Sequence, residues 1–198
     1  MKLVGRLILL VIALAVIAFF AAPGVAFFAL RSAAEANDAA GLSRLVDYGA
    51  LRQSLRPQLA GNPAAIAPAP SFLEDPIGAV RRQLEQAAPA PNAPDVDTYL
   101  TPAALAALTR GEGRYAALRT GDTAPSPEAT NAGGPMPRPV YWGMSRARMS
   151  VTDEGGSVTV FTFERTGLYE WKLVHVSLPE GAAPAPPVVV GRSGRRAG

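Results

Sequence analysis

The side chains that could act in catalysis are few in this sequence. His175 is the only histidine, and it stands in a stretch that alternates in polarity as strands do. A histidine acts as a general base only beside a suitable partner and within a pocket. On strict alternation His175 shares a face with Tyr169 and Trp171, so it either points into a cavity or is satisfied by a neighbour on the sheet. The second interpretation is the simpler, because no partner is evident.

Acidic residues occur in pairs, but their spacing fits helix caps and loops. Asp38 and Asp47 each precede a helical stretch, where a carboxylate accepts the N–H groups of the first turn. A catalytic carboxylate pair made of these two is the alternative. Asp95 and Asp97 lack the offsets and glycine turn of a calcium loop. We therefore assign no catalytic, cofactor-binding or metal-binding residue, and we expect no cofactor.

Two neighbouring aromatic residues could recognise a partner. Tyr141 and Trp142 follow a proline-rich run and precede the first strand-like stretch. They form either an exposed platform for a partner or a closure of the core at the sheet edge. The small number of aromatic residues favours the closure. The candidate pocket or contact residues are therefore His175, Trp171, Tyr169, Trp142 and Asp47.

The net charge of +3 does not indicate a nucleic-acid binder. Lys2 and Arg6 flank an apolar segment, and Arg192, Arg195 and Arg196 lie in the last seven residues. Without these five cations, 14 basic residues stand against 16 acidic ones. A nucleic-acid binder carries its basic face on the folded part, so we expect no nucleic-acid partner.

The composition also limits the chemistry. The sequence has no cysteine, which excludes thiolate catalysis, disulfide bonds and cysteine-ligated zinc in this chain. Alanine, glycine, proline and arginine are abundant, as is typical of GC-rich bacterial coding. Their abundance therefore says little about structure.

The first element is an apolar segment long enough to cross a membrane. From Leu7 to Leu30 there are 24 residues without a charge, and about 20 suffice for a transmembrane helix. Lys2 and Arg6 precede it, which predicts a cytoplasmic N-terminus. We expect residues 7–22 to contact the bilayer of the inner membrane in a single pass, with the body in the periplasm.

The same segment has a second interpretation as a cleaved signal peptide. Gly24, Val25 and Ala26 offer small residues near a cleavage site. The length of the apolar core favours a retained anchor, and both interpretations export the body. Pro23 with Gly24 predicts a break in the helix before a second apolar stretch.

Residues 27–178 are predicted to form one domain that begins with short helices, after an anchor or signal segment at 1–26. Helical spacing covers residues 27–37, and Leu51, Leu55 and Leu59 share one face of a later helix. Helix-start signals stand at Asp38, Asp47, Asp75-Pro76 and Thr101-Pro102. Ile77, Val80 and Leu84 would mark the buried face of the helix that Asp75 starts.

The pattern changes to strand-like alternation after residue 143. The stretches 144–151, 157–165 and 169–178 are joined by short turns that contain glycine. Short turns predict an antiparallel meander. The fold class is therefore α+β, with short helices packed on a C-terminal three- to four-stranded antiparallel sheet. Residues 112–139 are predicted to be a mobile loop, and 179–198 a disordered tail.

Several short stretches resemble a known family. They are the apolar segment ending in proline, Leu30–Asp38, Leu45–Tyr48, Asp75-Pro76, Tyr99–Pro102 and Trp171–Val174. Together they resemble the uncharacterised bacterial family called domain of unknown function 2939, over most of residues 1–178. The likeness departs at 112–139 and in the tail. A looser similarity is to the nuclear-transport-factor-2-like fold, in which helices meet a bent sheet around a cavity. The family has no established activity, so the resemblance implies no catalytic residues.

These observations predict a membrane-anchored envelope protein that acts as a non-catalytic binding or accessory module, with an envelope protein as its partner. The alternative is a small periplasmic enzyme or a carrier of a lipophilic ligand, using a cavity between helices and sheet. The enzymatic alternative requires His175 and a carboxylate to line one pocket.

Overall fold

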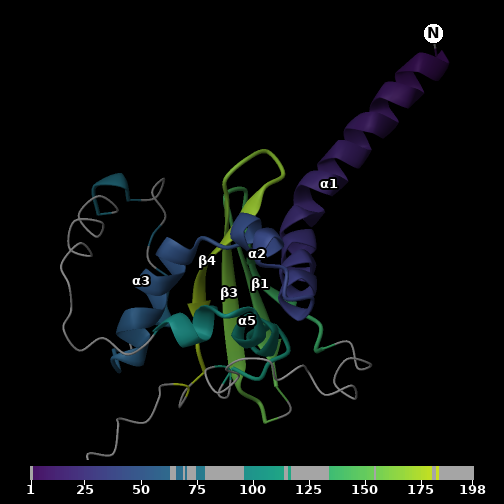
Figure 1. Ribbon diagram of the computed structural model, residues 1–198. Coiled ribbons are helices and arrows are strands. Elements are labelled where there is room, and N and C mark those ends of the chain that lie inside the picture. The colour runs from purple at the N-terminus through teal and green to yellow at the C-terminus, as the bar shows by residue number, and fades with distance from the viewer. Residues whose placement is uncertain are drawn as a thin grey trace, which may run out of the picture.

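The computed structural model describes residues 2–62, 66–68, 70, 75–78, 96–113, 116, 134–153, 155–179 and 182. In these ranges the helices precede the strands, which confirms the predicted α+β class (Figure 1). The elements are α1 (Lys2–Glu35), α2 (Ala39–Leu45), α3 (Tyr48–Leu59), the 3-10 helix η2 (Val96–Leu100), α5 (Pro102–Thr109), β1 (Arg138–Trp142), β2 (Arg146–Thr152), β3 (Val158–Arg165) and β4 (Trp171–Ser177).

The four strands form one antiparallel sheet in the order β1-β2-β3-β4. This confirms the predicted meander and adds β1, which begins inside the region predicted to be a loop at 112–139. The strand is short and contains Pro139, which an edge strand tolerates because one side of its backbone needs no partner. Residues 117–133 of the predicted loop, and most of the predicted tail, lie outside the described residues.

Helix α1 is continuous, so the predicted break at Pro23 is wrong. Proline removes one backbone hydrogen bond and crowds the carbonyl four residues earlier, which bends a helix but need not end it. Here Ala22 and Ala26, on either side of Pro23, are buried against the body. Figure 1 shows the N-terminal part of α1 projecting obliquely from the body.

The two halves of α1 have different surroundings. Residues from Val4 to Phe20 expose large apolar side chains, whereas Phe27 and Leu30 are fully buried. The ring of Phe27 meets those of Phe161 and Phe163 edge to face, with centroids 5.3 and 6.4 Å apart. The second half of α1 therefore covers one face of the sheet. By length and composition the helix is able to cross a membrane, a test that a signal sequence also passes.

The predicted helix caps are confirmed. Asp38 accepts a hydrogen bond from the amide of Gly41 and Asp47 from that of Ala50, both at 2.9 Å. Thr101 caps α5 in the same way through the amide of Ala104. The predicted apolar face of α3 is buried, and Pro57 does not end that helix.

The helix start at Asp75 is also confirmed, because its carboxylate accepts the amide of Gly78 at 2.8 Å. The predicted buried face is wrong at Ile77, which is 83% exposed. Helical spacing alone does not show whether a partner covers the apolar face. Val80 and Leu84 lie outside the described residues.

Helix α3 lies along the free edge of β4. The side-chain amide of Gln58 donates to the carbonyl of Val176 at 2.8 Å and accepts the amide of Leu178 at 3.0 Å. One glutamine therefore satisfies two backbone groups that an edge strand would leave unpaired.

Candidate functional site

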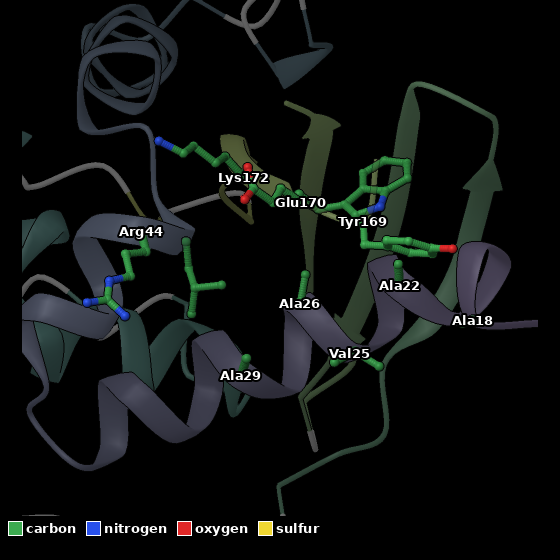
Figure 2. A pocket seen from close by; sticks show the side chains of 11 residues that line it. Ala18, Ala22, Val25, Ala26, Ala29, Arg44, Tyr169, Glu170 and Lys172 are labelled. Carbon is green, nitrogen blue, oxygen red and sulfur yellow. The ribbon is translucent and has the colours of Figure 1, made fainter. Parts of the chain in front are cut away.

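A pocket of about 590 Å³ lies where α1 enters the body. One wall is the side of α1 that carries Ala18, Ala22, Ala26 and Ala29, spaced so that all four share a face. The opposite wall is the stretch 169–172, which leads into β4 (Figure 2). Small side chains on the helix leave the space that larger ones would fill.

The lining of this pocket is mainly apolar, with charged groups at one end. Figure 2 shows Tyr169 near Ala18 and Ala22, and Arg44 and Lys172 toward the other end. Glu170 adds an acidic group to the same wall. Most of the lining side chains are apolar, which suits the binding of an apolar group.

The structure brings two of the five predicted candidates together in this pocket and leaves three elsewhere. Tyr169 and Trp171 line it. Trp142 is exposed on β1 and faces α1, since a Cβ atom on Gly24 would lie 3.9 Å from its ring. Asp47 caps α3, and its amide donates to the carbonyl of Leu173 at 2.9 Å.

The predicted closure of the core by Tyr141 and Trp142 is not found. Both side chains are exposed on the edge strand. The guanidinium of Arg148 lies 5.4 Å from the centre of the Tyr141 ring, on the face of the sheet turned away from Trp142. The short strand presents one aromatic residue on each face.

His175 lies on the face opposite to Trp171, which differs from the expectation from strict alternation. Leu173 pairs with Phe163, whereas His175 pairs with Thr162, so β4 has one extra residue at this point. Such a bulge reverses the face of every side chain beyond it. The ring nitrogen Nε2 of His175 is 3.1 Å from the carbonyl of Ile66 and 3.1 Å from the hydroxyl of Ser177.

The surroundings of His175 favour the neutral ring. Burial lowers the pKa of His175, and the nearby cations of Arg146 and Arg148 lower it further, while the hydrogen bond to Ile66 acts in the opposite direction. Because a carbonyl only accepts, the contact with Ile66 fits a proton on Nε2. Among the described residues, the groups that shift this pKa are Ile66, Arg146 and Arg148, and none of them is a carboxylate.

Carboxylates do not gather elsewhere in the described ranges. No three His, Asp or Glu side chains there lie close enough together to hold a metal ion. Glu164 lies on the same face of the sheet as His175. Its carboxylate accepts a hydrogen bond from the guanidinium of Arg146 at 3.1 Å.

Arg31 is a buried structural residue that the sequence reasoning missed. Its guanidinium donates to the carbonyls of Thr109, Gly134 and Pro135, and it lies 5.1 Å from the centre of the Phe27 ring. It thus ties α1 to α5 and to the segment before β1. The signal in the sequence that could have identified Arg31 is its position directly after the apolar stretch.

Comparison with known proteins gives one family match. Residues 12–108 match the family model described as "Protein of unknown function (DUF2939)", which spans α1 to α5 and stops before the sheet. No curated protein and no solved structure gives a significant match. The match includes the second half of α1, which forms one wall of the pocket and covers the sheet. Over residues 12–108 the chain is therefore similar to the DUF2939 family.

Proposed function

We propose that this protein is anchored in the inner membrane of a bacterium by α1 and presents its α+β body on the periplasmic side as a non-catalytic binding module. The observation that carries the proposal is the continuity of α1. One helix runs from exposed apolar residues directly into the core, without a linker. The body is thus fixed at the end of the apolar segment.

The contacts of α1 support a retained anchor over a cleaved signal peptide. A cut after Ala26 would leave Phe27, a central core residue, at the new N-terminus. It would also remove the contact of Phe19 with Arg165, and it would remove Gly24, which lies next to Trp142. The orientation follows from Lys2 and Arg6, because positive charge is retained in the cytoplasm.

The anchor is tested with the full chain, tagged at the C-terminus and expressed in a bacterial host. We expect the protein to remain in the membrane pellet after alkaline carbonate washing and to have the intact mass of the uncleaved chain. Protease added to spheroplasts should digest the body. A soluble protein whose N-terminus maps near residue 26 would overturn the anchor and support the signal peptide.

A second candidate function is the carriage of a lipophilic ligand, and the pocket between α1 and β4 favours it. Its apolar wall is continuous with the exposed apolar surface of α1, so an acyl chain could pass between bilayer and pocket. In the other form of the proposed binding module, the body binds a protein partner instead of a lipid.

Native mass spectrometry of the full chain, gently extracted from its own membranes, separates these two forms. A bound lipid supports the carrier, and a co-purifying protein supports the accessory module. The variant Ala29→Leu fills the pocket, and we expect it to lose a bound lipid. Ala21→Leu is the matched control, because Ala21 is exposed on the same helix outside the lining. Equal lipid content in both variants would contradict the carrier.

A further inference from the structure

We propose that the end of the sheet beside α1 rests on the membrane interface, held there by the tips of two hairpins. This inference depends on the proposed anchoring by α1 and adds how the body is oriented. The proposed partner is the bilayer surface. It contacts a defined part of the body, which we call the interface rim. The rim consists of Trp142, Met144, Leu168 and Tyr169.

The meander places two turns at the same end of the sheet. The turns after β1 and after β3 lie at one end, and the turn after β2 lies at the other, because neighbouring strands are antiparallel. In Figure 1 the turn after β3 rises at the top of the sheet, toward the side from which the free part of α1 departs. Two contacts fix this proximity. The guanidinium of Arg165 is 3.7 Å from the centre of the Phe19 ring, and Trp142 faces Gly24.

The two ends of the sheet differ in their exposed residues. At the end beside α1, Met144 is 73% exposed, Leu168 70%, Tyr169 48% and Trp142 39%. The described residues of the turn at the other end are Asp153, Gly155, Gly156 and Ser157, and the one exposed large apolar residue beside this turn is Val158, at 44%. Exposed apolar residues that gather at one site mark an interaction surface, and tryptophan and tyrosine are enriched at membrane interfaces.

The length of α1 brings the rim to the membrane. About 20 apolar helical residues are needed to cross the hydrocarbon core, and from Leu7 such a stretch ends near Ala26. Ala22 and Ala26 are already packed against the body. A bilayer of ordinary thickness would therefore reach past the point where α1 meets the sheet, and the hairpin tips on either side would lie at the headgroups.

The charges near the rim fit the same position. Arg165 stacks against the rings of Phe19 and Trp171, at 3.7 and 4.7 Å, and donates to the carbonyl of Leu168. It thus holds a cation beside the part of α1 that enters the bilayer, near the headgroup region. Glu170 in the same turn offsets one positive charge, so the apolar residues rather than net charge are the main attraction.

The absence of cysteine in the chain allows a direct test with single-cysteine variants of the full protein. Met144→Cys and Leu168→Cys place a polarity-sensitive fluorophore at the two tips. Gly155→Cys places it in the exposed turn at the far end and is the matched control. Each labelled protein is reconstituted into phosphatidylcholine–phosphatidylglycerol vesicles, with and without lipids that carry a spin-label quencher near the headgroup.

We expect emission to shift to shorter wavelength and to be quenched at least twofold more strongly for the two tip variants than for the control. If all three proteins float with the vesicles and the tip probes are no more quenched than the control, the anchor stands and the rim proposal is overturned. If none floats with the vesicles, the anchor itself fails and the rim proposal fails with it.

Discussion

The two faces of the sheet are held by different interactions. On the face covered by α1, Phe161, Phe163 and Leu173 are fully buried against Phe27 and its neighbours. On the opposite face, Arg146, His175 and Ser177 are also buried, but hydrogen bonds and an ion pair satisfy several of their polar groups. The first face is stabilised by apolar packing, and the second depends on each polar group finding its partner.

The largest effect is expected on the α1 face. Phe27→Ala would remove a fully buried ring from the centre of the apolar contact and should cost about 3–5 kcal/mol in the free energy of unfolding. Phe20→Ala is the matched control, since Phe20 is exposed on the free half of the same helix. Urea unfolding of the full chain in mild detergent measures both. Similar losses for the two variants would show that α1 does not divide into a free and a packed half.

A smaller effect is expected from the ion pair on the opposite face. Glu164→Gln would remove the charge of Glu164 from its ion pair with the buried guanidinium of Arg146. We expect a loss of about 2 kcal/mol, below the range for a fully buried pair because Glu164 is partly exposed. Asp97→Asn weakens the exposed pair with Arg52 and should cost less than about 0.5 kcal/mol. If the two variants lose the same stability, burial does not strengthen the pair with Arg146.

The contrast between the faces also explains what the sequence could predict. Periodicity identified the buried face of α3, made of Leu51, Leu55 and Leu59. Capping signals identified Asp38, Asp47 and Thr101, because both kinds of signal depend on local spacing. The bulge that turns His175 to the other face is not visible in the sequence, since it depends on pairing with β3. Arg31 was missed for the same reason: its three carbonyl partners lie far away in the sequence.

The candidate site was predicted in part. Tyr169 and Trp171 were candidates as neighbours of His175, and they line the pocket without it. The alanines that form its other wall were discounted as compositional background. Only the packing of α1 across the end of β4 shows that they leave a space. A pocket made by two elements distant in the sequence requires the tertiary structure.

The smallest effect is expected from His175, on the face of the sheet opposite α1. It is measured as the pH dependence of the free energy of unfolding. The pKa of His175 is lowered in the fold by burial and by Arg146 and Arg148. In the unfolded chain it takes its ordinary value near 6.5. Below that value the unfolded chain binds a proton that the folded chain does not, so stability falls as the pH decreases from about 6.5 toward the folded pKa. Above about 6.5 the contribution is fully present.

His175→Gln removes this titration and keeps a side chain that can donate to the carbonyl of Ile66. We expect the difference in unfolding free energy between the parent and His175→Gln to be constant above pH 7 and to change in favour of the variant as the pH falls below 6.5. Urea unfolding across this range measures it. A difference that moves in favour of the parent at acidic pH would mean that the charged ring is stabilised in the fold. His175 would then have an acidic partner, which is the carboxylate that the enzymatic alternative requires.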